Sequence, residues 1–210
     1  MKITLRVLLV AAIFLLVYMC YRSIMGSIEF DSEKGSRENA IKAHLVDIRK
    51  AQIEYKNVYG VHAANFDELS KFLKEKKLPF VIKEGELTDE QLEKGMKEKD
   101  AIKSGLIKRD TFWVLAKDTL FSPAYNVDSM SIVPVAGVNA RFSMDTATLV
   151  SPSGYTVKVF ESGVKYDTYL GGLNRQLLIN LKDKATKLGK YDGLRVGSVK
   201  EINNNAGNWE

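Results

Sequence analysis

An unbroken apolar run near the N-terminus restricts this chain more than any other feature of its sequence. Residues 3–21 read ITLRVLLVAAIFLLVYMCY, and Arg6 is the one charged residue among them. As an α-helix rising about 1.5 Å per residue, this run is about 28 Å long, close to the hydrocarbon thickness of a bilayer. The run therefore predicts a helix that lies in lipid, because water disfavours so much apolar surface.

Three interpretations of residues 1–26 compete: an uncleaved transmembrane signal anchor, a cleaved signal peptide and a buried core helix. Signal peptidase needs small residues before its cut, whereas the letters RSIMG follow the run. A lipoprotein needs a small residue before its cysteine, and the bulky Met19 precedes Cys20. We expect the uncleaved anchor. Its expected lipid-facing and interfacial residues are Leu8, Ile13, Leu16, Tyr18 and Tyr21.

Basic residues on both sides of the run leave the positive-inside rule nearly balanced. They are Lys2 and Arg6 at its start and Arg22, Lys34 and Arg37 after it. Since short N-terminal tails usually stay in the cytoplasm, we expect a single pass with the remaining residues on the other side of the membrane.

Charges of both signs alternate along most of the remaining chain. The 210 residues include 31 Lys and Arg and 26 Asp and Glu, for a net charge of +5. The interleaving from Lys83 to Lys103 is typical of a solvated surface, so we expect no nucleic-acid partner. A tethered domain of this charge should be weakly attracted to anionic lipid headgroups. The one cysteine, Cys20, lies in the apolar run, which fits an oxidising compartment for the rest.

A second helix is expected after the anchor. Residues 27–35 contain glycine and mixed charges and are predicted to be a hinge, after which Ser36 would cap the helix. Its apolar stripe is Ile41, Leu45, Ile48, Tyr55 and Tyr59, with Gln52 on the same face. The stripe is either a short coiled-coil seam or a face that packs on a sheet, and the second is expected. Gly60 is the expected helix end.

Residues 36–210 are predicted to form one soluble α+β domain, in which the amphipathic helix packs on a mainly antiparallel sheet. The part over 36–105 is predicted to be helical, with a short helix opened by Asn65, a strand over 78–82 and a highly charged helix from Thr88 through about Lys103. Residues 106–170 are rich in β-branched and aromatic residues, and strands are predicted at 107–121, 131–138, 140–149, 155–160 and 164–169. Residues 171–210 are predicted to hold a helix over 174–188 and a polar tail.

Side chains able to do catalysis form no recognisable motif. His44 and His62 stand alone, whereas zinc sites have three or four ligands at short spacings. Ser162 and Lys165 match the S-x-x-K pattern of serine acyl enzymes, but that pattern needs a helix start and this segment is predicted to be a turn between strands. We therefore expect no catalytic residue, no metal and no cofactor.

Two groups of oxygen-bearing side chains are further candidates for chemistry. Asp89, Glu90 and Glu93 lie among lysines on a predicted helix, which is typical of a solvated face. Calcium in a C-terminal loop is an alternative for a second group, although no ligand spacing enforces it. That group is Asp183, Asp192, Asn203, Asn204 and Asn205.

The order of parts resembles type IV pilins and the pseudopilins of type II secretion. The resemblance is carried by residues 40–72, which include IRKAQIEYKNVYG and NFDELSKFL. Pilins carry a Gly-Phe-Thr-Leu-Ile-Glu motif at which the prepilin peptidase cuts. That motif is not present here, and the sequence GSIE at 26–29 follows the apolar run. The whole chain, including its GNWE end, is also similar to uncharacterised membrane-anchored proteins of the Bacteroides group. That similarity implies a Gram-negative envelope.

These features together predict a non-enzymatic, pilin-like envelope component, anchored in the inner membrane with its domain in the periplasm. Its expected partners are the lipid bilayer and other envelope proteins. The alternative is a tethered binding module for a small envelope ligand or polymer, with Phe112, Trp113 and Tyr125 as the ligand surface. An enzyme with an unfamiliar site is the third hypothesis.

Overall fold

The computed structural model describes residues 2–85, 88, 91, 95 and 97–210. The chain divides into two compact units. Unit 1 comprises residues 1–66 and 129–210, and unit 2 comprises residues 67–128. The α+β class, the long apolar N-terminal helix and the antiparallel sheets agree with the prediction. The single domain predicted over 36–210 is corrected, because residues 67–128 form a unit of their own between the two segments of unit 1.

Unit 1 begins with one continuous helix, α1 (Lys2–Tyr59), of 58 residues. The hinge predicted over 27–35 is wrong, because these residues are helical, and Ser36 lies inside the helix instead of capping it. A glycine in a helix costs only about 1 kcal/mol relative to alanine, so long helix-forming flanks outweigh it. The predicted end is correct. Gly60 has a φ of 72°, and its N–H donates to the carbonyl of Lys56 at 2.7 Å.

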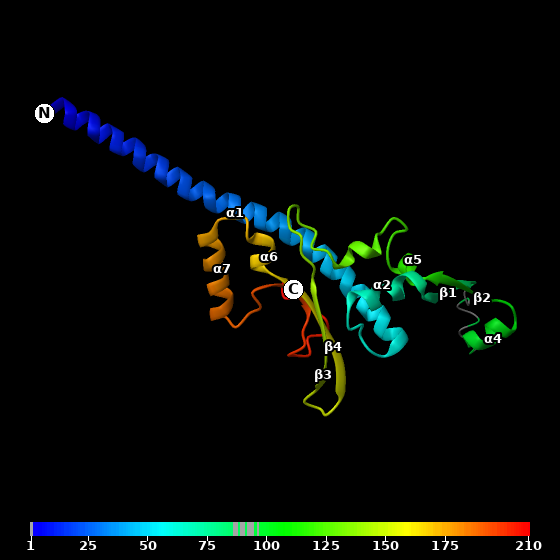
Figure 1. Cartoon of the computed structure of the whole chain (residues 1–210). Coiled ribbons are helices and arrows are strands. Elements are labelled where there is room, and N and C mark those ends of the chain that lie inside the picture. Colours follow the sequence, from blue (N-terminus) through cyan, green and yellow to red (C-terminus); the bar gives the residue numbers. More distant parts are fainter. Residues whose placement is uncertain (1, 86–87, 89–90, 92–94, 96) are drawn as a thin grey trace. The chain divides into compact units, whose positions relative to one another are not determined.

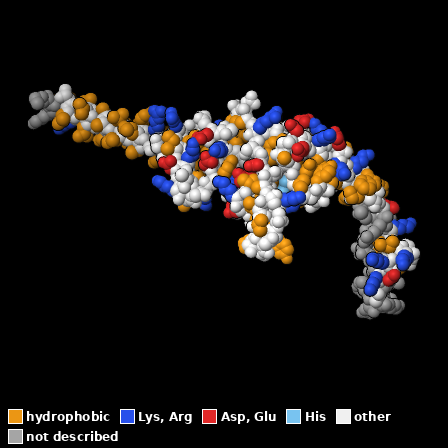
Figure 2. All heavy atoms as spheres, turned by 60° about the horizontal axis from the view of Figure 1, so that its bottom comes forward, with side chains coloured by type: hydrophobic (Ala, Val, Ile, Leu, Met, Phe, Trp, Pro, Cys, Tyr) orange, Lys and Arg blue, Asp and Glu red, His pale blue; other side chains and the backbone are white. Residues whose placement is uncertain are grey.

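Apolar side chains of α1 change from exposed to buried at Phe30. Every large apolar side chain from Ile3 to Ile28 is exposed, whereas Phe30 is buried and residues further along α1 belong to the core of unit 1. In Figure 1 the N-terminal half of α1 projects away from the other elements of unit 1. Figure 2 shows hydrophobic side chains along this projecting half. The helix thus joins an unburied apolar segment to a packed core without a break.

The sheet of unit 1 has three antiparallel strands in the order β3-β4-β5. They are β3 (Ser143–Val150), β4 (Thr156–Lys165) and β5 (Gly193–Gly197). The short strand β5 approaches β4 closely, since a Cβ on Gly197 would lie 2.1 Å from the carbonyl oxygen of Phe160. Only glycine fits there, and its φ of 72° also favours glycine. Helix α1 contacts both β4 and β5.

Two helices separate β4 from β5. They are α6 (Tyr166–Leu170) and α7 (Arg175–Lys187). Asn174 caps α7, accepting hydrogen bonds from the N–H groups of Gln176 at 3.0 Å and Leu177 at 3.3 Å. The helix predicted over 174–188 is therefore confirmed.

Two predicted strands of unit 1 are wrong. Residues 131–138 contain the end of η1 (Val127–Ser131) and one isolated bridge, between Ile132 and Arg141. The strand predicted over 164–169 ends at Lys165, where α6 begins. Tyr and Thr favour strands over helices, so local strand propensity was overridden here, where the ladder to β5 ends at Lys165.

Unit 2 contains a separate two-stranded antiparallel sheet. Its strands are β1 (Lys77–Glu84) and β2 (Lys108–Leu115), which agree with strands predicted there. Its helices are α4 (Glu98–Lys103), α5 (Ala116–Leu120) and α2 (Phe66–Glu75). The first residue of α2, Phe66, ends the first segment of unit 1. The strand predicted over 107–121 stops at Leu115 and gives way to α5. Of the helix predicted from Thr88 to Lys103, the described helix α4 covers the end, and most earlier residues lie outside the described ones.

Candidate functional site

The exposed segment of α1 is the first candidate site. Among the described residues, one helix is long and apolar enough to cross a membrane, and its best window has a mean hydropathy of 2.5 with none of it buried. A signal sequence has the same properties, so the segment is compatible with either a transmembrane anchor or a signal segment. The five expected anchor residues, Leu8, Ile13, Leu16, Tyr18 and Tyr21, all lie on it and are at least 50% exposed.

The stripe of α1 divides into a buried part and an exposed end. Ile41, Leu45 and Ile48 are fully buried. Tyr59 is exposed, and its ring lies 4.7 Å from the ring of Tyr55. The first three residues therefore belong to the core, whereas the two tyrosines form a tilted ring pair at the end of the helix.

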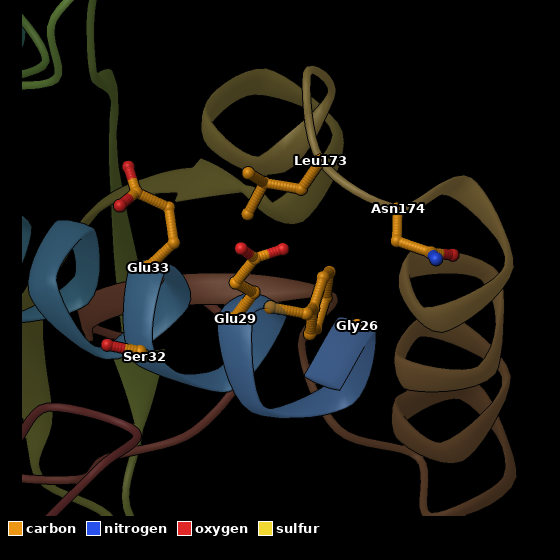
Figure 3. Close-up of a pocket in the computed structure, with 7 residues that line it drawn as sticks. Gly26, Glu29, Ser32, Glu33, Leu173 and Asn174 are labelled. Atoms are coloured by element: carbon orange, nitrogen blue, oxygen red, sulfur yellow. The ribbon is translucent and has the colours of Figure 1, made fainter. Parts of the chain in front are cut away.

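A hollow of about 460 Å³ lies where α1 leaves the body of unit 1 (Figure 3). It is lined by Gly26, Glu29, Phe30, Ser32 and Glu33 of α1 and by Leu173 and Asn174, which precede α7. Figure 3 shows Glu29 pointing from α1 toward Leu173. Glu33 is engaged, because it accepts a hydrogen bond from Arg37 Nε at 2.9 Å. An acidic lining beside apolar walls suits a positively charged group of a partner more than an anion.

Side chains next to this hollow fasten α1 to α6. Arg37 Nη1 donates to the carbonyl oxygen of Tyr169 at 2.7 Å, and the hydroxyl of Tyr169 donates to Glu38 Oε1 at 3.2 Å. Tyr169 is fully buried, and this burial together with the carboxylate of Glu38 raises the pKa of its hydroxyl. The hydroxyl thus stays a hydrogen-bond donor. The sequence contains no local signal for this contact, because its partners are more than 130 residues apart.

The C-terminal tail is fastened along β5. Asn208 donates from its side-chain nitrogen to the carbonyl of Gly193 at 2.9 Å and accepts from the N–H of Arg195 at 3.1 Å. The guanidinium of Arg195 pairs with Glu161 at 2.8 Å. At the chain end, Arg49 Nη1 of α1 lies 2.7 Å from Glu210 Oε1. The tail is therefore attached to β5 and to α1 by its side chains.

The predicted ligand surface in unit 2 does not converge on one point. Phe112 and Trp113 are neighbours on β2, so their side chains point to opposite faces of the sheet. Both are exposed. Tyr125 lies in the loop after α5, where its ring stacks on Phe121 at 4.3 Å. Two residues on opposite faces cannot line the same pocket, so these aromatics suit separate contacts better than one deep binding site.

The two histidines lie in unit 1, and each is beside a phenylalanine ring. His44 lies 6.4 Å from the ring of Phe142, and burial lowers its pKa. His62 is buried, and its ring lies 4.8 Å from the ring of Phe160. Burial and the nearby ammonium of Lys56 lower the pKa of His62 to about 4, against the opposing effect of backbone groups. His62 is therefore a core residue whose imidazole is neutral at neutral pH. Because its pKa is lowered, the stability of the fold should depend on pH.

Ser162 and Lys165 do not come together as a catalytic pair. Ser162 and Lys165 lie three residues apart on β4 and thus on opposite faces, and Ser162 Oγ donates to the carbonyl of Ser143 at 2.9 Å. The predicted turn between strands is wrong there, although the separation of the two side chains is as expected. Asp89, Glu90 and Glu93 lie outside the described residues.

The calcium alternative finds no support in the C-terminal tail. Within the described ranges, no three His, Cys, Asp or Glu side chains are grouped so that they would hold a metal. Asn203 Nδ2 instead donates to the carbonyl of Ala206 at 3.1 Å. Asn204 and Asn205 have φ values of 54° and 60°, which is a conformation asparagine tolerates in tight turns. These amides shape a turn.

Comparison with known proteins finds no matching family model, no matching curated protein and no matching solved structure.

Proposed function

We propose that this chain is a non-enzymatic, single-pass membrane component of a bacterial envelope that acts through contacts with other proteins. The observation that carries the proposal is the continuity of α1, which passes from the exposed apolar segment to the buried core as one helix. Lipid is the environment that covers such an apolar helix without any change in the packed unit.

The continuous helix also defines how the anchor acts. A flexible linker would let the domain rotate freely above the membrane, whereas an unbroken helix with a fastened base transmits the tilt of the span to unit 1. Arg37 and Glu38 hold α1 to Tyr169, and Lys56 donates to the carbonyl of Lys158 on β4 at 2.9 Å. Unit 1 is therefore a rigid extension of the anchor, which suits an assembly part better than a diffusing enzyme.

The pilin-like layout supports the same proposal. An apolar helix that continues into a half packed on antiparallel strands is the arrangement that the resemblance implies for α1, β4 and β5. In this proposal the anchor lies in the inner membrane and both units lie in the periplasm. Processing by a prepilin peptidase is not part of it, since the GSIE sequence at 26–29 lies after the apolar run.

Exposed apolar side chains indicate where protein contacts are made. Val150 and Tyr155 flank the turn between β3 and β4 and are among the most exposed large apolar residues of unit 1 outside α1. In unit 2, Phe80 and Phe112 are cross-strand partners, so they lie on one face of the sheet, and both are exposed. Single exposed apolar residues are common, so in this proposal the two pairs are the positions at which contacts are tested.

Photocrosslinking in native membranes tests the proposal. A photoreactive amino acid is placed at Tyr155 or Phe112, and Lys200, an exposed polar position in unit 1, serves as the matched control. We expect discrete crosslinked protein adducts at one or both apolar positions and none at Lys200. Absence of any adduct at both apolar positions would contradict a function through protein contacts. A reporter fused at the C-terminus that is active only in the periplasm tests the orientation.

A further inference from the structure

Most of the net positive charge of the chain lies in one short segment. Residues 175–190, here called the basic segment, comprise α7 and the turn that follows it. They contain five basic residues and one acidic residue, for a net charge of +4, against +5 for the whole chain. The basic residues are Arg175, Lys182, Lys184, Lys187 and Lys190. Residues 71–77 of unit 2, with four lysines and one glutamate, also carry a basic excess, whereas charges of both signs alternate along most of the chain.

The structure places the start of this segment beside the base of the apolar helix. Asn174, the cap of α7, lines the same hollow as Gly26 and Glu33 of α1. Gly26 and Glu33 lie about 8 Å and 18 Å beyond Tyr21 along the helix axis, at about 1.5 Å per residue. A headgroup layer is about 5–8 Å thick, so α7 begins within roughly one Debye length of the lipid surface at 0.1 M salt.

Figures 1 and 2 agree with this placement. In Figure 1, α7 lies beside α1 at the base of its projecting half. In Figure 2, Lys and Arg side chains lie where the hydrophobic projecting half meets the body of the protein, together with Asp and Glu side chains. Basic side chains are therefore present near the point at which the chain would enter a membrane.

We propose that the basic segment binds the anionic headgroups of the membrane in which α1 is anchored. This inference rests on the proposed function in one respect, since it takes residues 3–21 as the membrane span. The occupant is lipid because the covalent anchor holds the lipid surface permanently next to α7. Charge complementarity and proximity then act together, as for basic segments next to transmembrane helices.

The exposed side chains of the basic segment fit a lipid surface. Ile179 is 41% exposed and Leu188 is 58% exposed, so apolar groups stand among the lysines. Lysine stems lie along apolar surface while their ammonium groups reach phosphates. Lys182 is paired with Asp167, which leaves Arg175, Lys184 and Lys187 on α7 as the exposed basic residues that bear the charge. Contact with headgroups would fix the tilt of unit 1 against the membrane, because α1 and α7 belong to the same unit.

Fluorescence of the full-length chain in vesicles tests this inference. In a Cys20→Ser background, Ile179→Cys carries an environment-sensitive dye on α7, and Tyr155→Cys carries the same dye at the distant β3–β4 turn as a control. The vesicles contain either phosphatidylcholine alone or phosphatidylcholine with phosphatidylglycerol. We expect the dye at position 179 to be shielded from a water-soluble quencher in the anionic vesicles alone, and high salt to remove the shielding. The dye at position 155 should be quenched equally in both.

Two triple variants of equal charge change identify the residues. Arg175→Glu with Lys184→Glu and Lys187→Glu should abolish the shielding at position 179. Lys158→Glu with Lys165→Glu and Lys200→Glu, all exposed in unit 1, should leave it intact. Equal quenching at position 179 in both vesicle types, or equal loss of shielding in both triple variants, would overturn the inference. Flotation with the neutral vesicles tests the span separately, because the anchor needs no anionic lipid.

Discussion

The side chain of Gln52 is bonded twice to the backbone of Ala63. Its Nε2 donates to the carbonyl oxygen of Ala63 at 3.0 Å, and the N–H of Ala63 donates to its Oε1 at 2.9 Å. Both residues are fully buried. One amide thus satisfies two backbone groups at the point where the chain turns back after α1, which explains a polar residue on an otherwise apolar stripe.

Replacing Gln52 with leucine is expected to destabilise unit 1 by about 3 kcal/mol, because two buried backbone groups lose their partners. The measurement is urea unfolding in detergent, followed by Trp209 fluorescence in a Trp113→Phe background, so that the signal comes from unit 1. Gln176→Leu is the control, since Gln176 is exposed on α7. Equal unfolding midpoints for the two variants would contradict a structural role for this pair.

Acid is expected to destabilise unit 1 through His62. Its pKa is about 4 in the folded chain against 6.5 in the unfolded chain, so the unfolded state binds the proton first. The stability is fully present above pH 6.5 and is lost as the pH falls toward 4. Between pH 7 and pH 5 the expected loss is about 2 kcal/mol. His62→Leu should remove this part of the pH dependence of the free energy of unfolding. An unchanged pH dependence in that variant would rule out His62 as the cause.

The tail is expected to open when Asn208 is replaced with alanine. That change removes the two hydrogen bonds that the side chain makes with Gly193 and Arg195. A loss of about 1.4 kcal/mol would raise the open population roughly tenfold. Trypsin should then cut after Lys200, the one trypsin site in the tail, roughly ten times faster under conditions where opening is at equilibrium. Asn180→Ala on α7 is the control, and equal cutting rates would count against the tail contact.

The continuity of α1 is tested by Gly35→Ala. Gly35 lies inside the helix, and nothing lies within 4 Å of a Cβ added there. Alanine should therefore stabilise the chain by about 0.5–1 kcal/mol through its better helix propensity. Gly60→Ala should have the opposite effect, because its φ of 72° disfavours a side chain. A thermal midpoint that Gly35→Ala leaves unchanged or lowers would favour a hinge over 27–35 instead of a helix.

Local patterns predicted those elements whose signals are complete within a few residues. Asn174 caps α7 and Gly60 ends α1 as expected, because capping depends on neighbouring backbone groups. The strand β5 had no such signal, since five residues reading GLRVG show no alternation and depend on pairing with β4. The hinge was wrong for the opposite reason. Gly26 and Gly35 are a strong local signal, but their cost is small against the rest of a 58-residue helix.

The candidate site was less predictable than the fold. The apolar segment is readable from composition alone, and its exposure in the structure agrees with that reading. The hollow joins residues 26–33 to Leu173 and Asn174, which are about 140 residues apart in the sequence. The contact of Arg37 with Tyr169 is equally distant. Such contacts depend on how the helices pack, so no local sequence motif predicts them.

Membrane extraction of the full-length chain tests the central claim most directly. After treatment of isolated membranes with alkaline carbonate, we expect the protein to stay in the pellet and to float with lipid in a density gradient. Placing charges at the centre of the span, by Ile13→Arg with Leu16→Arg, should release it, because each arginine there costs about 2.5–3.5 kcal/mol. Recovery of the unmodified chain in the aqueous fraction would contradict the anchor and every role proposed from it.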